Sequence, residues 1–527
     1  MKKLISILLC IVLTMGLMAC GGSNNQTSTA GGKATEKSTA AQGTEAQPQT
    51  GESGGGGSAA SGIDFNEDPY TLNVCYAVLG EAQPDLAMIE EKLNEITLKE
   101  INAKVKLEAV SLFSMANVYA LKASGQEKVD LMLLFPGSTY LTSFANSNLI
   151  RPIEAYMDQW GADLKAGLGS MLEAGQYKGH QYAIPQNRDV RKNGNGFNLS
   201  KDLCAKYDID PKSITTIEAL EAAFETIKEN EPEVTVLMPE TSGGGIAIAL
   251  ADYYDTCGTG GGILEVQEDG KLKIVNQVET ESYKNACLKV REWYEKGYIS
   301  KDVLTTQDSG STMLPAGKCF AVAATSINPN MGDKYSIAVV INKDKPLLTT
   351  TDDQLILWAV ASSCERPDKA VQFINLCFTS EEITNLTMYG VSDVHYTKLE
   401  NGAINTANNA NWQNFWPMFG DYGKQYVVDA NMEVMGVQTV EEYKKTMAAW
   451  ELETSPAYGF NFDPANVKTQ IAACDAVNNE FMLPIANGTV DVDGEMEKWA
   501  KKLDEAGLGD VMEEKQAQLD EWVASKQ

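Results

Sequence analysis

Basic residues are scarce in this chain of 527 residues. There are 43 Lys and Arg against 72 Asp and Glu, which gives a formal net charge of −29 at pH 7. A body with this excess of negative charge is repelled by the phosphates of nucleic acids and by anionic lipid head groups. We therefore expect neither nucleic acid nor a lipid surface as a partner of the folded body, and the acidity mainly favours solubility.

Histidine is almost absent. The two histidines, His180 and His395, have no ligand-spaced partner nearby, and the chain contains no His-Glu-x-x-His motif. The acidic stretch 489–494 fails as a calcium loop, because Thr489 stands at the first position and Ala500 stands where a bidentate Glu belongs. We expect no metal ion and no cofactor, and we interpret both histidines as structural.

Closely spaced cysteine pairs are absent as well. Ten cysteines occur, of which Cys10 and Cys20 lie near the N-terminus, and none forms a Cys-x-x-Cys motif. Several of the others lie in apolar patterns, where a free thiol behaves as a small hydrophobic group. A body of this size does not need disulfides, even in an oxidising compartment. We expect mostly free, buried thiols at Cys75, Cys204, Cys257, Cys287, Cys319, Cys364, Cys377 and Cys474.

Long hydrophobic runs are missing except at the N-terminus. Two lysines follow Met1, and the apolar stretch 4–17 is shorter than the roughly 20 residues of a membrane span. The sequence Leu-Met-Ala-Cys at 17–20 resembles a bacterial lipoprotein signal. The resemblance implies that residues 1–19 are a signal peptide and that Cys20 is the lipidated anchor. An uncleaved anchor and ordinary secretion are the alternatives.

Large hydrophobic side chains are absent from residues 21–62, which consist mainly of Gly, Ser, Thr, Ala, Asn and Gln. Such a segment cannot bury enough apolar area to offset its ordering entropy. We interpret residues 20–62 as the lipidated cysteine and a flexible tether, with an end-to-end distance of roughly 35 Å.

The body, residues 63–527, alternates between strand and helix patterns. A nearly continuous apolar run at 129–135 is typical of a strand covered on both faces. The pattern restarts near Gly196, which predicts a second α/β unit, and residues 467–527 are largely helical. The expected strands are 70–79, 105–110, 129–135, 234–238, 319–325, 335–341 and 355–361, and the expected helices are 84–101, 115–123, 216–228, 281–296 and 367–379.

Four stretches, 179–185, 197–203, 361–370 and 389–396, carry a resemblance over nearly the whole body. The body resembles a bacterial extracellular solute-binding protein of the carbohydrate ABC-transporter type. Its end, residues 458–522, resembles a domain of unassigned function found in a subset of such proteins from Gram-positive bacteria. The resemblance implies a two-lobed α/β fold of the periplasmic-binding-protein type with hinge crossovers and a helical C-terminal segment.

The resemblance also implies that both lobes are discontinuous in sequence. Lobe 1 is expected to comprise residues 63–188 and 356–400. Lobe 2 is expected to comprise residues 189–355 and 401–527, and the sequence leaves the lobe assignment of 401–527 open.

The function implied by the resemblance is that of a substrate-binding lipoprotein. It would capture an extracellular carbohydrate, with an oligosaccharide favoured, and deliver it to ABC transporter permease subunits. We expect a monomer on the outer face of a bacterial, Gram-positive cell membrane, attached through its lipid only. A lipid-anchored glycoside hydrolase or lyase is one alternative, although nothing marks acid pairs such as Asp352 and Asp353 as a catalytic dyad. A surface glycan-binding adhesin is the other.

Sugar sites combine aromatic platforms with amide, carboxylate and guanidinium groups, because sugars present apolar faces ringed by hydroxyls. The aromatic stretch 409–422 lacks periodicity and is interpreted as an exposed loop, although a core position is open for each tryptophan. A polar run lies at the first expected crossover, where a surface turn is the alternative. The candidate ligand-binding residues are Trp412, Trp416, Gln186, Asn187, Arg188, Asp189, Tyr140, Tyr182 and Trp358.

Overall fold

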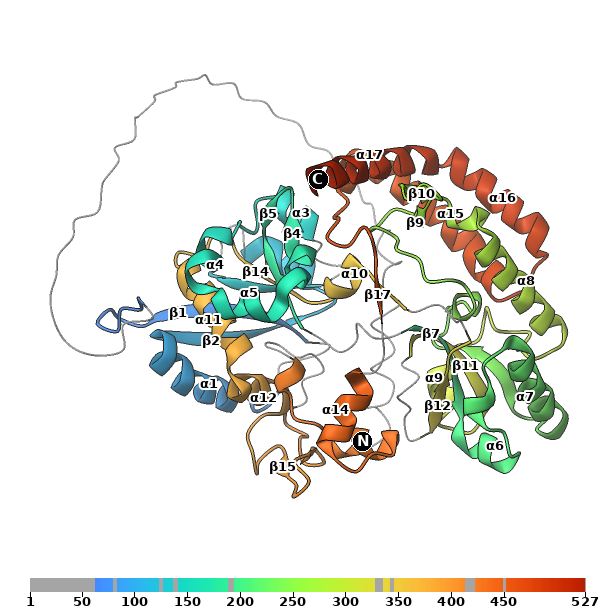
Figure 1. The fold of residues 1–527 in the computed structure, drawn as a ribbon, viewed down its shortest axis with the longest axis horizontal. Coiled ribbons are helices and arrows are strands. Elements are labelled where there is room, and N and C mark those ends of the chain that lie inside the picture. Colours follow the sequence, from blue (N-terminus) through green and yellow to red (C-terminus); the bar gives the residue numbers. More distant parts are fainter. Residues whose placement is uncertain are drawn as a thin grey trace, which may run out of the picture.

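The chain forms two α/β bodies that lie side by side and are joined by crossing segments (Figure 1). This computed structural model describes residues 62–78, 83–122, 127–135, 141–187, 194–327, 335–341, 346–412, 422–448 and 452–526. Within these ranges, none of the helices combines the length and apolar character that crossing a membrane requires. The two-lobed α/β architecture and the helical C-terminal segment predicted from the sequence are confirmed.

The first lobe is built on a five-stranded sheet with the order β2-β1-β3-β14-β6. Strands β1, β2 and β3 are parallel, and β14 lies antiparallel between β3 and β6. The strands are β1 (Tyr70–Val78), β2 (Ala103–Ser111), β3 (Leu131–Leu134), β6 (Ala183–Pro185) and β14 (Leu357–Val360). The helices are α1 (Leu86–Ile101), α2 (Met115–Leu121), α3 (Leu141–Asn146), α4 (Glu154–Trp160), α5 (Ala162–Leu168), α11 (Pro367–Thr379) and α12 (Glu381–Tyr389), with the 3₁₀ turn η3 (Gly169–Gly175) and the short hairpin β4 (Gln176–Tyr177) and β5 (His180–Gln181).

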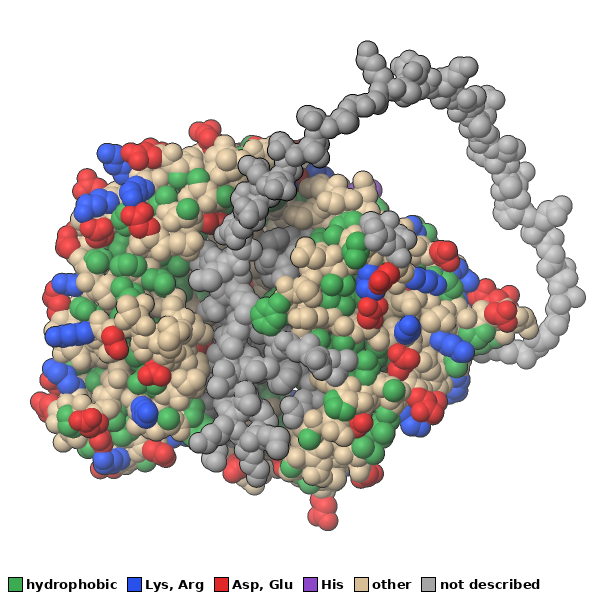
Figure 2. Space-filling view, turned by 180° about the vertical axis from the view of Figure 1, so that it is seen from behind, with side chains coloured by type: hydrophobic (Ala, Val, Ile, Leu, Met, Phe, Trp, Pro, Cys, Tyr) green, Lys and Arg blue, Asp and Glu red, His purple; other side chains and the backbone are tan. Residues whose placement is uncertain are grey.

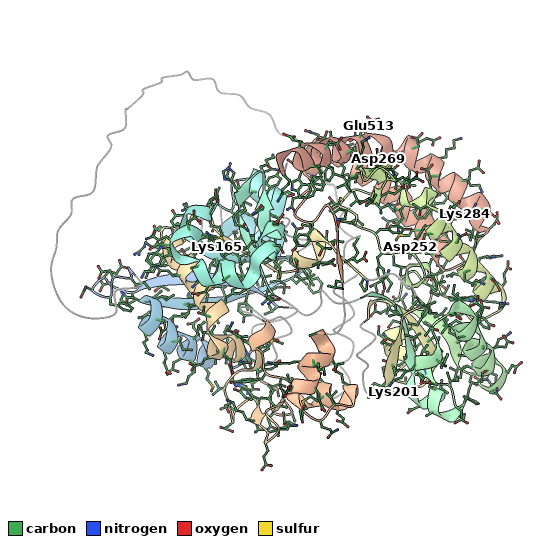
Figure 3. All side chains as sticks on the ribbon, viewed as in Figure 1. Lys165, Lys201, Asp252, Asp269, Lys284 and Glu513 are labelled. Carbon is green, nitrogen blue, oxygen red and sulfur yellow. The ribbon has the colours of Figure 1, made fainter. Side chains whose placement is uncertain are left out.

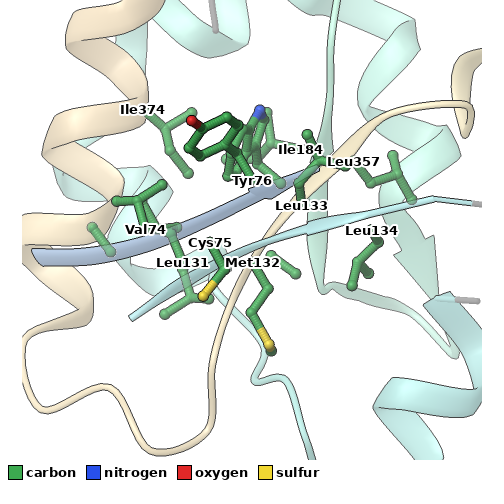
Figure 4. Packing of buried hydrophobic residues seen from close by; sticks show 14 of the residues in the cluster. Val74, Cys75, Tyr76, Leu131, Met132, Leu133, Leu134, Ile184, Leu357 and Ile374 are labelled. Carbon is green, nitrogen blue, oxygen red and sulfur yellow. The ribbon is translucent and has the colours of Figure 1, made fainter. Parts of the chain in front are cut away.

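Apolar spacing and capping residues explain the local structure of this lobe. In α1 the buried positions Ile89, Leu93 and Ile101 repeat at helical spacing, and Asn102 ends the helix in the left-handed conformation at φ 47°. Helix α11 begins at Pro367, where the missing N–H costs no hydrogen bond. Figure 4 shows side chains of β1, β3, β6, β14 and α11 meeting in one core.

The second lobe is built on a four-stranded sheet with the order β12-β7-β11-β8. Thr216 and Thr280 cap α7 and α8 with their side-chain oxygens. The strands are β7 (Gly194–Ser200), β8 (Thr235–Pro239), β11 (Cys319–Ile327) and β12 (Ser336–Val339), with the hairpin β9 (Ile263–Val266) and β10 (Leu272–Val275). The helices are α6 (Lys201–Lys206), α7 (Ile217–Asn230), α8 (Glu281–Glu295) and α9 (Gly310–Met313).

Three C-terminal helices, α15 (Lys468–Ala486), α16 (Val492–Glu505) and α17 (Leu508–Lys526), pack on the second lobe. Trp499 of α16 belongs to the same buried cluster as Phe197 of β7 and Trp293 of α8. The second lobe therefore completes its core with residues that lie far along the chain.

Residues 390–412 and 422–448 form an insertion that packs against the first lobe. Trp412 belongs to the core of that lobe, and the Tyr426 backbone N–H donates to Asn385 Oδ1 of α12 at 2.8 Å. The sequence left the lobe of residues 401–527 open, and in the structure the described part up to residue 448 lies against the first lobe, while the C-terminal helices pack on the second. The physical reason is a small apolar core, which ties the insertion together beside α12. Its elements are β15 (Thr397–Lys398), β16 (Ile404–Asn405), α13 (Asp429–Met435) and α14 (Val440–Ala448).

The described surface carries mixed charge. On the face shown in Figure 2, acidic and basic side chains are interspersed over both bodies. Figure 3 shows Lys165 on the first lobe and Lys284 and Glu513 on the second, all on outer helices. The eight cysteines of the described body are free and buried, as the sequence predicted.

Candidate ligand-binding cleft

The chain crosses between the lobes after β6, before β14 and near β17 (Glu453–Thr454). The second crossing contains β13 (Leu347–Leu348), which pairs in parallel with β17, and the short helix α10 (Thr350–Asp353). The Gln186 backbone N–H of the first crossing donates to the Ile356 carbonyl of the second at 3.3 Å. The crossings are thus bonded to one another.

In the first lobe these crossings meet the sheet at one edge. Leu357 at the start of β14 pairs with Leu134, the last residue of β3, and with Pro185, the last residue of β6. The parallel strands β1 and β2 end at this edge too, where Val78 pairs with Ser111.

The second lobe presents the equivalent edge. Gly194 at the start of β7 pairs with Ile327 at the end of β11, and β8 runs parallel to β11. All strands of the two sheets except β14 and β7 therefore turn their carboxyl ends toward the crossings. In open α/β sheets this is where ligands bind, so the candidate cleft lies between the lobes.

One exposed aromatic side chain marks the rim of the first sheet. Phe113 follows directly after β2, and 67% of its surface is exposed, whereas its neighbour Leu112 is buried. An exposed aromatic ring offers a flat apolar face suited to a sugar ring. Sequence reasoning missed this residue; the signal available was an aromatic residue between two serines, Ser111 and Ser114, just after an alternating strand.

A buried histidine holds a carboxylate at the same rim. His395 is 1% exposed; its Nδ1 accepts from the Val391 backbone N–H at 2.9 Å, so its Nε2 carries the hydrogen and donates to Asp85 Oδ2 at 3.0 Å. Gly390 makes room for the ring, because a Cβ there would lie 2.5 Å from Nδ1. Asp85 precedes α1 without capping it, and 23% of its side chain is exposed. The structure thus gives His395 a structural role, and sequence reasoning missed Asp85.

Two of the candidate residues lie at the first crossing. Gln186 is buried and Asn187 is half-buried at the end of β6. Tyr182 is half-buried elsewhere, with its ring 6.3 Å from those of Tyr177 and His180. Cys20, Tyr140, Arg188, Asp189 and Trp416 lie outside the described residues.

The two described tryptophan candidates lie in the core of the first lobe. Trp358 on β14 is 1% exposed, and Trp412 is 0% exposed, with its Nε1–H donating to the Thr387 carbonyl at 3.2 Å. A ring without exposed surface offers no face to a sugar in this arrangement. Of the two positions that the sequence left open for Trp412, the structure shows the one in the core, with the indole buried against α12.

The acid pair of the second crossing is used in structural bonds. Asp352 Oδ2 accepts from the Thr349 backbone N–H at 2.7 Å and from its hydroxyl at 2.8 Å, and Asp353 accepts from the Tyr458 hydroxyl. The bonds to Asp352 stabilise the second crossing from within, and the bond from Tyr458 ties it to the third crossing.

Two parts of the chain match known families. Residues 87–383 match the bacterial extracellular solute-binding protein family, and residues 456–524 match a domain of unknown function. The first match covers more than half of the chain, so this protein belongs to the bacterial extracellular solute-binding proteins.

Relatives extend over most of the chain. A carbohydrate ABC transporter substrate-binding protein of Streptococcus pneumoniae is 25% identical over 459 residues, which is 85% of this chain and 90% of the relative. The N-glycan transport solute binding protein of the same species has a similar fold, with a TM-score of 0.73 and 22% identity over 87% of this chain and 100% of that one. Its complex with Man5GlcNAc gives a TM-score of 0.63 and 23% identity, covering 87% of this chain and 99% of that one.

Proposed function

We propose that this protein is the substrate-binding lipoprotein of a carbohydrate ABC importer. It captures an extracellular oligosaccharide between its lobes and delivers it to the permease subunits without altering it. The observation that carries the proposal is the convergence of strand carboxyl ends from both lobes on the crossings, in a member of the solute-binding family. The related carbohydrate-transporter protein and the glycan complex of similar fold support a sugar as the ligand.

The proposed site uses groups from the rim and the crossings. Phe113 supplies an apolar face, Asp85 accepts hydrogen bonds from hydroxyls, and Gln186 and Asn187 contribute amides at the cleft floor. We retain Arg188, Asp189, Tyr140 and Trp416 as proposed ligand contacts. Trp358 and Trp412 support the site from within the core, and Tyr182 lies beside Tyr177.

Anchoring and location complete the proposal. Cys20 carries the lipid that holds a monomeric body on the outer face of a Gram-positive membrane, and the segment to residue 62 is its tether. Replacing Cys20 with Ser should release the protein into the medium, whereas Cys10→Ser should leave it cell-bound. Retention of the Cys20→Ser protein on the cells contradicts a lipid anchor.

A glycan panel tests the binding function. A ligand at one hundred times its dissociation constant stabilises the folded state by about 2.7 kcal/mol, so the correct oligosaccharide should raise Tm measurably. Chromatography of the incubated glycan should recover it intact. Cleavage would make the protein a hydrolase or lyase, and Tm shifts with peptides alone would contradict a sugar ligand.

Phe113 offers a sharper test because the chain contains a matched control. Phe113→Ala should weaken binding of the stabilising glycan roughly three- to tenfold, since an aromatic stacking contact contributes about 0.5–1.5 kcal/mol. Phe65, 52% exposed and preceding β1 at the opposite end of the strand, serves as the control. Equal affinities of the two variants would remove Phe113 from the site.

A further inference from the structure

The C-terminal module, defined here as residues 456–526, touches both lobes. On the second lobe its attachment is apolar, because Phe481, Ile485 and Trp499 lie in the core of that lobe. Helix α17 spans about 28 Å along its axis. It runs from the second lobe to the first, where its C-terminal end lies near α3, β4 and β5 (Figure 1).

On the first lobe the attachment is mainly polar, beside one small apolar cluster that includes Ala174 and Tyr458. Asp463 Oδ2 accepts from the Tyr177 hydroxyl at 2.6 Å, from Asn146 Nδ2 at 3.1 Å and from Lys178 Nζ at 3.2 Å. We call these contacts the Asp463 latch. Bonds of this kind break at lower cost than an apolar core is opened, and the Lys178 side chain is 62% exposed.

The module holds Asp463 in position for these contacts. Gln518 of α17 bonds its backbone on both sides, accepting from the Asp463 N–H at 2.8 Å and donating to the Asp463 carbonyl at 2.9 Å. The other carboxylate oxygen, Oδ1, accepts from the Ala465 N–H at 3.1 Å. One oxygen therefore serves the module and the other serves the first lobe.

The latch adjoins the crossings. Asn461 donates to the Gln176 carbonyl at 2.7 Å and accepts from Gln354, which follows α10 in the second crossing. The Gly459 N–H donates to Thr350 Oγ1 of α10 at 2.8 Å. Lobes joined by such segments move by hinge rotation, so contacts placed here respond to the angle between the lobes.

We propose that the C-terminal module, including the domain of unknown function, is an interlobe strut that holds the unliganded protein open. It is built into the second lobe and grips the first through the Asp463 latch. Phe113 at the rim is two-thirds exposed, so the second lobe does not cover this side chain. Closure over a ligand must work against the latch, which therefore sets affinity without touching the ligand.

Two variants weaken the latch from opposite sides. Tyr177→Phe removes the donated hydroxyl and keeps the ring, which is buried in the first lobe. Asp463→Asn can keep the acceptor for Ala465 while placing an amide donor before Tyr177, Asn146 and Lys178. Tyr207→Phe is the matched control, because the Tyr207 hydroxyl donates to Glu231 at 2.7 Å within a single lobe.

Lobe separation is measured without ligand, so this arm does not depend on the proposed function. Spin labels are attached to cysteines introduced at the exposed positions Lys99 on α1 and Glu229 on α7, in the full chain carrying Cys10→Ser and Cys20→Ser. The eight thiols of the described body are buried and do not compete for label. Both latch variants should shift the distance distribution toward shorter values, and the control should match the parent. Unchanged distributions in both latch variants overturn the proposal.

The second arm rests on the proposed function and uses the glycan that raises Tm. Both latch variants should bind it roughly three- to tenfold more tightly, because less of the binding free energy is spent on closing the lobes. Unchanged or weaker binding in both variants overturns the role in affinity. If no glycan binds the parent protein, the proposed function fails while the distance measurement still decides whether the strut exists.

Discussion

Lys369 in the first lobe and Lys515 in the second are both buried, and the two lobes accommodate these cations differently. Lys369 in the first lobe is 1% exposed; it donates to the Ile101 carbonyl at 2.8 Å and pairs with Glu67 at 3.3 Å. Lys515 in the second lobe is fully buried and donates to the carbonyls of Thr256 and Gly261 at 2.9 and 2.7 Å. No carboxylate of the described residues lies within 4.0 Å of its Nζ.

The difference reflects how the lobes are completed. The first lobe neutralises Lys369 with a carboxylate close to the surface, Glu67. The second lobe uses a residue of the last helix to satisfy carbonyls of its glycine-rich segment 256–262, where the backbone at Gly258, Gly260, Gly261 and Gly262 has positive φ. Helix α17 is therefore part of that lobe's interior, and burial lowers the pKa of Lys515 to about 8.

The largest expected effect is a loss of stability when a buried tryptophan is removed from the core of either lobe. Trp412→Ala should cost the first lobe about 3–5 kcal/mol, as removal of a buried tryptophan does. Trp499→Ala, at a position 3% exposed, should cost the second lobe a similar amount. Urea unfolding, monitored by hydrogen exchange of amides in each lobe, shows which lobe has lost stability.

Glycan affinity of the folded fraction decides the role of Trp412. It should stay within twofold of the parent in Trp412→Ala, because the ring has no exposed surface. Full stability combined with lost glycan binding would return Trp412 to the cleft.

A pH titration sharpens the contrast between the lysines. The pKa of Lys515 falls from 10.5 to about 8 on folding, so between these values the unfolded chain binds more protons. Stability should therefore rise with pH across this window, by up to about 3 kcal/mol from this residue. Urea midpoints of the parent and of Lys515→Met, compared at pH 8 and 10, measure it. Equal slopes in both proteins would mean that Lys515 titrates alike in the folded and unfolded states.

The smallest expected effect concerns Glu67. Hydrogen bonding from Arg366, with a further contribution from Lys369, lowers the pKa of Glu67 against the opposing effect of burial. The resulting stability is present above the unfolded pKa of 4.5 and is lost as pH falls through the lower folded value. Glu67→Gln should lower Tm slightly at pH 7 and leave it unchanged in stronger acid. A Tm difference that persists in acid would point to lost packing instead.

Local elements were the most predictable part of the fold. Helix α11 runs over Pro367–Thr379, the bounds expected from its proline start and one-sided apolar spacing. Strand β1 begins at Tyr70 as expected and runs through Val78, and Leu79 lies outside the described residues. These elements carry their signals within a few residues, so no distant contact is needed to specify them.

The candidate site was less predictable because its residues depend on distant contacts. The stretch around Trp412 lacks periodicity and was expected to be exposed, yet the insertion brings it against Thr387 of α12. Asp85 gains its position from His395, 310 residues away. A single sequence contains no pattern that would pair Trp412 with Thr387 or Asp85 with His395.

The placement of β14 has a consequence for how the chain acquires its structure. This strand lies between β3 and β6, so the first sheet stays split until residues 357–360 have been synthesised. The core of the second lobe is completed later still, because it includes Trp499 and Leu508. Strand pairings and core contacts between residues this far apart in sequence form slowly, because the entropy of closing the loop is lost before the stabilising contacts are made. We expect nascent chains halted before residue 357 to remain protease-sensitive throughout.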